Sequence, residues 1–272
     1  MATSVQDLLR WNGTLPDPRD TPGVKGKDQA RKAVDKMAPE LAELQEKLFA
    51  NGKLGDTRKV LLLLQGMDAS GKDGTVKHVV GQVNPAGCRI TSFGKPTKEE
   101  LAHDFLWRIT NALPTAGQLG VFNRSQYEDV LVVRVHDLVP RAVWGRRYAR
   151  INAWEKRLAA QGTTLVKVFL HISPAEQKER LLARIEDPTK HWKIGDHDIA
   201  ERALWDDYQT AYLTALEKCT TDVAPWYVVP ADRKWYRDWA VSSLLLETLR
   251  GLDLGWPTPE GLDLKAMKKQ LG

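Results

Sequence analysis

The chain has 272 residues, 42% of them hydrophobic, which is enough for one large α/β domain with a buried core. Its longest apolar run, residues 60–64, is too short to cross a bilayer, and residues 1–11 lack the cationic start and apolar centre of a secretory signal. Two distant cysteines exclude a disulfide-rich secreted protein. The net charge of +5, without a basic tail, leaves both nucleic acid and a small polyanionic substrate open as partners. We therefore expect a cytoplasmic protein with no membrane partner.

Helical and strand patterns alternate along the chain after an irregular start. Residues 1–27, rich in Pro, Gly and Asp, predict an extended arm on the surface or on a neighbouring subunit. The predicted helices have apolar residues at helical spacing and cover residues 28–50 (kinked or broken at Pro39), 71–83, 97–113 (capped by Thr97 with Glu100), 127–138, 141–161, 174–185, 198–220 and 235–250. The predicted strands are short apolar runs and cover residues 58–65, 88–93, 118–122, 163–172 and 226–230.

This alternation predicts an α/β fold, in which a parallel sheet of about five strands is flanked by helices on both faces. We expect one domain over residues 28–257, preceded by the arm (1–27) and followed by a C-terminal tail (258–272).

The segment Gly66-Met67-Asp68-Ala69-Ser70-Gly71-Lys72 has the G-x-x-x-x-G-K spacing of a P-loop and lies between a predicted strand and a predicted helix. Glycines let backbone N–H groups turn inward, and a helix N-terminus adds positive charge, so the segment predicts a phosphate-binding loop of a kinase. We expect Lys72 to reach the transferring phosphoryl group. The alternative is a glycine turn with a solvated lysine. The residues expected to surround the phosphates are Gly66, Met67, Ala69, Ser70, Gly71, Asp73, Gly74 and Thr75.

Two acidic residues depart from the ordinary P-loop. Asp73 follows the lysine, where most P-loop enzymes have a hydroxyl that binds Mg²⁺. Asp68 lies inside the loop, where an uncompensated carboxylate would repel phosphate, so a metal ion or a hydroxyl donor is expected between them. Asp68 is therefore the first candidate for a Mg²⁺ ligand, and a loop-capping aspartate is the alternative.

Polar residues follow the third predicted strand, at the edge of the sheet where ligands bind. Arg124 suits bidentate contact with phosphate, and Asn123 or Glu128 offers an oxygen to a metal ion through water. The alternative is a helix start, in which Asn123 or Ser125 caps the helix and Glu128 favours its dipole.

A basic segment follows the fourth strand and contains Arg180, Arg184, Lys190 and Lys193. With a phosphate loop elsewhere in the chain, we interpret residues 184–197 as a mobile lid that neutralises phosphate charge, although a solvated helix end has the same composition.

Arg108 belongs to the helix after the second strand, where nucleotide kinases bind the acceptor. It is four residues from Asp104, so an exposed ion pair is the alternative to a nucleotide contact.

Taken together, these segments resemble the polyphosphate kinase 2 family over residues 17–257. The resemblance rests on GMDASGKDGT (66–75), NPAGCRITSFGKPTKEEL (84–101), FNRSQYEDVLVVRV (122–135), FLHISPAEQKERLLAR (169–184) and WDDYQTAY (205–212). It implies Mg²⁺-dependent, reversible phosphoryl transfer between inorganic polyphosphate and nucleotides, on a thymidylate-kinase-like fold with a helical lid. It assigns Asp68 and Lys72 to the loop, Arg124 to the third strand end, and Arg184, Lys190 and Lys193 to the lid.

Many family members have Asp at the position of Asn123. The pair of Asn123 and Glu128 resembles the subgroup that phosphorylates both nucleoside mono- and diphosphates, which makes AMP and ADP the expected acceptors. Two other functions stay open: an ATP-dependent nucleoside monophosphate kinase of the thymidylate type, and a non-catalytic protein that binds polyphosphate or nucleic acid. Asp73 argues against the first, and Lys72 with Asp68 and a basic lid against the second. We expect no nucleic-acid partner and, by analogy, a homo-oligomer.

Overall fold

The computed structural model describes residues 3–272 and places five parallel strands in one sheet, in the order β2-β3-β1-β4-β5. The strands are β1 (Lys59–Gln65), β2 (Cys88–Ser92), β3 (Leu119–Asn123), β4 (Thr163–His171) and β5 (Trp226–Pro230). Every neighbouring pair is parallel, so the carboxyl ends of all the strands lie at one edge. The predicted five-stranded parallel sheet is confirmed.

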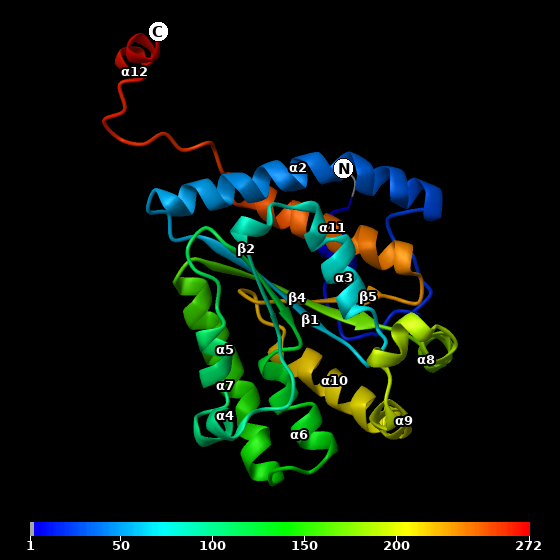
Figure 1. The fold of residues 1–272 in the computed structure, drawn as a ribbon. Coiled ribbons are helices and arrows are strands. Elements are labelled where there is room, and N and C mark those ends of the chain that lie inside the picture. Colours follow the sequence, from blue (N-terminus) through cyan, green and yellow to red (C-terminus); the bar gives the residue numbers. More distant parts are fainter. Residues whose placement is uncertain (1–2) are drawn as a thin grey trace.

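Helices cover both faces of this sheet. In Figure 1, α2 and α11 run side by side above the sheet, and α7 and α10 lie below it. The helices are α1 (Val5–Leu9), α2 (Lys27–Lys53), α3 (Lys72–His78), α4 (Lys98–Ala102), α5 (Trp107–Asn111), α6 (Val132–Val135), α7 (Arg141–Ala160), α8 (Pro174–Glu186), α9 (Asp196–Ala203), α10 (Trp205–Cys219), α11 (Lys234–Gly251) and α12 (Leu264–Leu271). None of the helices within residues 3–272 has the length and apolar character of a membrane span.

The central strand β1 positions the loop that follows it. Its residues 60–64 are a valine and four leucines, each 0% exposed, because a strand covered on both faces requires a continuous apolar run. In the register of the sheet, Leu64 lies opposite Asn123 of β3, and Gln65 lies opposite Phe169 of β4. The segments that follow β1 and β3 therefore start side by side.

The N-terminal arm lies against its own chain and is not extended throughout, because it contains α1. Leu9, Trp11 and Val24 are buried, and the backbone N–H of Trp11 donates to the carbonyl of Trp226 in β5 at 2.8 Å. Of the two outcomes predicted at Pro39, a kink or a break, the break is wrong, since α2 continues through this residue. Packing along α11 stabilises this long helix despite the missing hydrogen bond.

The predicted helix 97–113 is two short helices, α4 and α5. Thr97 and Glu100 form the expected capping box at its start. Asp104 then accepts a hydrogen bond from the backbone N–H of Leu106 at 3.1 Å, which closes a turn between the two helices. Aspartate competes with helical hydrogen bonds in this way, so the helix ends early.

Two further predicted helices are interrupted. Residues 127–138 form a 3₁₀ turn, Gln126–Asp129, and the single turn of α6, because β-branched valines favour a helix poorly. Residues 198–220 divide at Leu204 into α9 and α10. The tail stands away from the body in Figure 1 and ends in α12.

Candidate active site

The loop between β1 and α3, residues 66–71, adopts backbone conformations that favour glycine. The φ angle is +151° at Gly66 and +108° at Gly71, where a side chain would be strained. A Cβ atom on Gly71 would also collide with the guanidinium of Arg237 from α11. Ala69 adopts a φ of +63°, which is uncommon for a residue with a side chain. The tight loop expected from the motif is therefore formed, and Arg237 packs directly against it.

Lys72, the first residue of α3, folds back beneath this loop. Its Nζ donates to the carbonyl oxygens of Gly66 at 2.7 Å and Met67 at 3.3 Å, and the residue is 8% exposed. Burial, together with the nearby charge of Arg124, lowers the pKa of Lys72 to about 8. A phosphate in the loop would raise this pKa again, because a neighbouring negative charge favours the protonated amine.

Asp68 and Arg124 connect the loops that follow β1 and β3. Nη2 of Arg124 lies 2.8 Å from Oδ1 of Asp68. Burial alone would raise the pKa of Asp68, but the charges of Lys72 and Arg124 outweigh burial and hold that pKa below its usual range. Arg124 has a φ of +66°, and its backbone N–H donates to Leu64, so the strand end itself sets its position. Asp68 is therefore a carboxylate at neutral pH.

Asn123 and Asp73 lie next to this pair. The amide Nδ2 of Asn123 donates to Oδ1 of Asp73 at 2.8 Å, and Lys193 donates to Oδ2 of Asp73 at 3.0 Å. The amide orientation leaves the Oδ1 of Asn123 as the oxygen available to a water. The third strand end therefore faces the phosphate loop, as the topology of a parallel sheet predicts.

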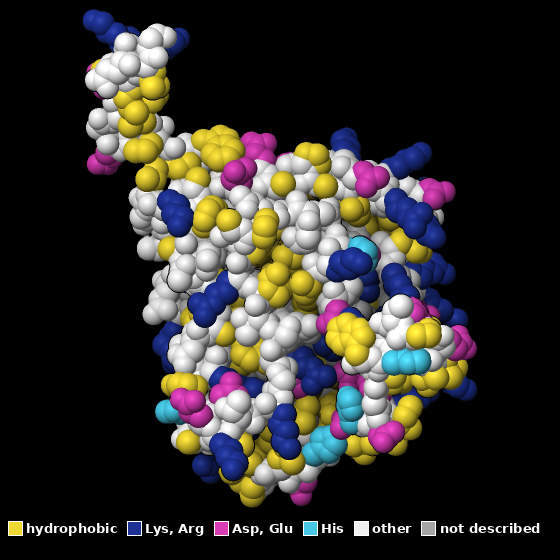
Figure 2. All heavy atoms as spheres, in the orientation of Figure 1, with side chains coloured by type: hydrophobic (Ala, Val, Ile, Leu, Met, Phe, Trp, Pro, Cys, Tyr) yellow, Lys and Arg dark blue, Asp and Glu magenta, His cyan; other side chains and the backbone are white. Residues whose placement is uncertain are grey.

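A cavity of about 550 Å³ lies over the loop, and we call it the basic cavity. Its cationic lining residues are Lys72, Arg124, Arg180, Arg184, Lys190, Lys193, Lys234 and Arg237. Three aspartates also line it, Asp68, Asp73 and Asp198. Figure 2 shows Lys and Arg side chains gathered between the segment of α8 and α9 and the rest of the molecule. Such a concentration of positive charge suits a ligand with several phosphates.

The predicted lid segment covers one side of the basic cavity. Lys193 bonds to Asp73 of α3, and the guanidinium of Arg184 donates to the carbonyl of Lys193 at 3.0 Å. Lys190 pairs with Asp187 at 2.7 Å, within the same segment. All three predicted lid cations thus line the cavity above the loop.

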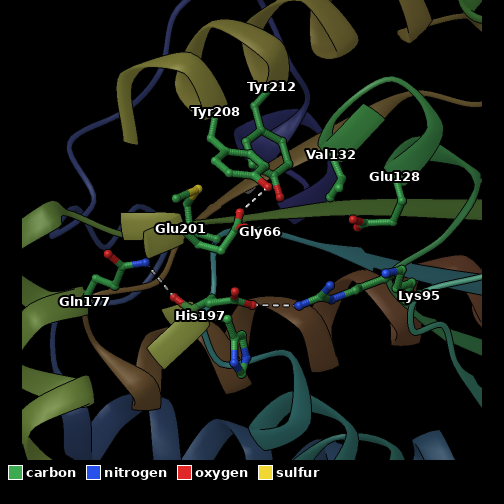
Figure 3. Close-up of a pocket in the computed structure, with 12 residues that line it drawn as sticks. Gly66, Lys95, Glu128, Val132, Gln177, His197, Glu201, Tyr208 and Tyr212 are labelled. Carbon is green, nitrogen blue, oxygen red and sulfur yellow. Dashed lines mark hydrogen bonds and ion pairs between the residues drawn. The ribbon is translucent and has the colours of Figure 1, made fainter. Parts of the chain in front are cut away.

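A second cavity of about 330 Å³, the tyrosine pocket, meets the first. Asp68, Arg124 and His197 line both cavities. In Figure 3, Tyr208 and Tyr212 enter the pocket from α10, and Glu128 points into it from the other wall. Its remaining lining residues are Gly66, Met67, Lys95, Val132, Gln177 and Glu201. Aromatic walls with a few charged groups are typical of a site for a small organic ligand.

Hydrogen bonds hold Tyr208 in place. Its hydroxyl donates to Oε2 of Glu201, and Nε2 of His136 lies 2.9 Å from the other oxygen, Oε1. Burial raises the pKa of both Tyr208 and Tyr212, so both hydroxyls stay protonated at neutral pH. Tyr208 and Glu201 therefore present polar groups to the pocket in a defined position.

Two arginines predicted to bind phosphate or nucleotide, Arg180 and Arg108, donate hydrogen bonds to backbone carbonyls. Arg180 is 9% exposed and donates to the carbonyls of Ala69, Ser70 and Ala231. Although Arg180 lines the basic cavity, its guanidinium therefore supports the loop, because the carbonyls use the donors that a phosphate would need.

Arg108 is buried as well, and it does not form the ion pair with Asp104 that was the alternative to a nucleotide contact. It donates to the carbonyl of Gly94 at 3.0 Å, whereas Asp104 pairs with Arg150. Arg108 thus holds the segment that carries Lys95, a residue of the tyrosine pocket.

Other loop residues divide between the two cavities. Ala69, Ser70, Gly71, Asp73 and Gly74 line the basic cavity, whereas Gly66 and Met67 line the tyrosine pocket. Thr75 lines neither, since its hydroxyl donates to the carbonyl of Gly71 at 3.2 Å.

Several site residues carried no assignment from the sequence. Tyr208 and Tyr212 belong to the segment WDDYQTAY, and their i,i+4 spacing was an available signal. Arg237 and Lys234 start α11, and Lys95, His197 and Glu201 are single polar residues in loops or short helices. Only the folded chain brings these distant residues together.

The residues present fit a magnesium ion that arrives with its phosphates. Asp68 uses Oδ1 for Arg124, and its Oδ2 makes no hydrogen bond within residues 3–272. In the same residues, no three His, Cys, Asp or Glu side chains come together as a metal cluster. Mg²⁺ is commonly held by one or two carboxylates together with waters and substrate phosphates. One free carboxylate oxygen and the amide of Asn123 match that mode of binding.

Comparisons with known proteins show the family to which the chain belongs. The family model "Polyphosphate kinase 2" matches residues 24–254. An AMP/ADP-polyphosphate phosphotransferase of Meiothermus ruber is 51% identical over 245 residues, which cover 90% of each chain. An ADP-polyphosphate phosphotransferase of Rhodopseudomonas palustris is 42% identical over 97% of this chain and 94% of that one. The crystal structure of polyphosphate kinase 2 from Arthrobacter aurescens superposes with a TM-score of 0.95 at 51% identity, covering 99% of this chain and 97% of that one. The chain therefore belongs to the polyphosphate kinase 2 family.

Proposed function

We propose that this protein transfers a phosphoryl group from inorganic polyphosphate to AMP and to ADP, which makes ADP and ATP, and that the reaction is reversible. One observation carries the proposal: the basic cavity and the tyrosine pocket meet at Asp68 and Arg124. A donor with many phosphates suits the first cavity, and an acceptor with an aromatic base and few phosphates suits the second. The names of the relatives from Meiothermus ruber and Rhodopseudomonas palustris agree with these substrates.

In the reaction, an oxygen of the acceptor's terminal phosphate attacks the last phosphorus of the polyphosphate chain. The bond from that phosphorus to the bridging oxygen breaks, and the shortened chain keeps the electron pair. Lys72 and the N–H groups at the start of α3 hold the transferring group, because they lie at the floor of the basic cavity. Arg124 contacts both cavities and stabilises charge on the attacking and transferred phosphates.

Asp68 and, through water, Asn123 or Glu128 would hold the magnesium ion at this junction. When bound, Mg²⁺ neutralises charge on the phosphate oxygens. Arg184 and Lys193 exclude water when the lid lies over the loop.

The test is to incubate the protein with Mg²⁺ and AMP, and with either polyphosphate or ATP as donor. We expect ADP and then ATP from AMP with polyphosphate. An ATP-dependent nucleoside monophosphate kinase would use ATP and leave polyphosphate untouched. A non-catalytic binder of polyanions would turn over neither donor.

A further inference from the structure

A third hollow lies outside the site described above, and we call it the outer hollow. It has a volume of about 660 Å³ and is lined by residues of α6, α7 and α10. Its principal side chains are Arg134, Arg141, Trp144, Arg146, Thr214 and Lys218. It shares no lining residue with the basic cavity or the tyrosine pocket. It is therefore a separate place on the molecule.

All the charged side chains that line the outer hollow are cationic. Arg134, Arg141, Arg146 and Lys218 line it, and no carboxylate does. Among residues 3–272, none of these four cations forms an ion pair with a carboxylate, whereas most cations around the phosphate loop do. Like charges held together repel one another, and an anion that bridges them removes that repulsion. The hollow thus suits a multivalent anion.

Contacts within the protein hold the side chain of Arg134 in a defined position in the hollow. Nη1 of Arg134 donates to the hydroxyl of Thr214 at 2.8 Å, and its guanidinium lies over the ring of Trp144 at 5.0 Å. Because this guanidinium already stacks on Trp144, the hollow offers charge rather than a free stacking surface for a base. A linear phosphate chain matches that chemistry better than a nucleotide does.

The outer hollow lies behind the tyrosine pocket. Val132 of α6 lines the pocket, and Arg134 of the same helix lines the hollow. Likewise, Tyr212 of α10 lines the pocket, and Thr214 lines the hollow. We infer that the outer hollow is a docking site for a distant stretch of a long polyphosphate donor whose end lies in the basic cavity. This inference rests on the proposed function.

Docking at a second site raises the effective concentration of the chain end at the first site. The benefit requires a donor long enough to occupy both sites, so short oligophosphates gain nothing from the hollow. The inference therefore predicts a dependence on chain length that the catalytic site alone does not produce.

Gly145 allows a direct test of the docking site, because it lines the hollow and a Cβ atom there would meet open space. Gly145→Glu adds a carboxylate among the four cations, and Gly145→Gln adds nearly the same volume without charge. Neither substitution should weaken α7, because Gly has a low helix propensity.

A triple variant, Arg141→Gln with Arg146→Gln and Lys218→Gln, removes the charge of the hollow directly. Lys156→Gln with Arg157→Gln neutralises exposed cations elsewhere on α7 and controls for net charge.

The measurement is the KM for a long polyphosphate and for a short oligophosphate, with AMP saturating. We expect Gly145→Glu and the triple variant to raise the KM for the long donor roughly tenfold. Their KM for the short donor, their KM for AMP and their kcat should match wild type. All constants of the two controls, Gly145→Gln and the Lys156 and Arg157 double variant, should match wild type as well. Equal effects on short and long donors, or no effect on the long donor, would overturn the inference. If wild type turns over neither donor, the proposed function fails instead.

Discussion

The amine of Lys193 in the lid lies 3.0 Å from a carboxylate oxygen of Asp73, the residue that directly follows Lys72. The pair joins the lid to the first turn of α3, beside the loop that holds phosphate. Phosphates that enter the basic cavity must therefore compete with a carboxylate for this lysine. The position that carries a hydroxyl in most P-loop enzymes carries a competing anion here.

We predict that Asp73→Asn lowers the KM for polyphosphate. The pair is partly exposed, and such pairs are worth about 0.2–1 kcal/mol, which corresponds to a change of roughly 1.4- to 5-fold. Steady-state kinetics with polyphosphate as the varied substrate measure this change. Asp35→Asn, an exposed acid on α2, is the matched control. A higher KM in the Asp73 variant would mean that the carboxylate holds the lid in its productive position.

Lys72→Ala should lower turnover by roughly two to three orders of magnitude. The substitution removes a positive charge from a buried site, where such a group contributes about 3–4 kcal/mol to the transition state. Lys77→Ala, which alters an exposed lysine of the same helix, should keep wild-type turnover. Circular dichroism verifies that both variants are folded. Near wild-type turnover in Lys72→Ala would refute the phosphate-loop assignment.

Asp68→Asn should raise the Mg²⁺ concentration needed for half-maximal activity, by roughly tenfold. The amide keeps the shape of the side chain but loses the charge that attracts the ion. Nucleotide affinity should change less, because the pocket keeps its tyrosines. Titrating activity against Mg²⁺ at saturating AMP measures the effect, with the exposed Asp207→Asn as control. An unchanged half-saturation point would return Asp68 to a structural role in the loop.

The lid cations should separate into two kinetic classes. Neutralising Lys190 and Lys193 together should raise the KM for polyphosphate, since both line the basic cavity, and AMP affinity should stay nearly normal. Arg184→Gln should instead lower kcat by about a hundredfold, because a guanidinium over the transferring group acts mainly in the transition state. A loss of AMP affinity with unchanged polyphosphate kinetics would mean that donor and acceptor sites have been exchanged.

The order and type of most elements could be predicted because the signals were local. The buried run of β1, the loop after it and the segment after β3 are each readable within a few residues, and parallel topology brings their ends together. Helix boundaries were predicted less well, for example where a single side chain overrode the pattern. Asp104 is an example, since its hydrogen bond to Leu106 ends α4 early.

The site was predicted less completely, because it depends on packing between distant segments. Spacing places Arg180 and Arg184 on one face of α8, but it does not say which other segment each of them contacts. The structure turns Arg180 toward the carbonyls of Ala69 and Ser70 and leaves Arg184 at the lid. Arg237 likewise reaches Gly71 only through the packing of α11 on α3.

The lowered pKa of Lys72 predicts how activity depends on pH. In the free enzyme the amine has a pKa of about 8, so its charge is present below this value and is lost as the pH rises through it. The ratio kcat/KM reports the free enzyme, and it should fall about tenfold per unit above pH 8 when polyphosphate is varied. The phosphate of AMP does not account for this fall, because its second pKa is near 6.

Bound phosphate raises the pKa of Lys72, so kcat should stay level to a higher pH than kcat/KM does. Lys72→Arg is the matched control, because a guanidinium keeps its charge throughout this range. Its residual kcat/KM should therefore be flat between about pH 7 and 9.5. A flat wild-type profile over the same range, or an identical decline in Lys72→Arg, would show that some other group controls the pH dependence.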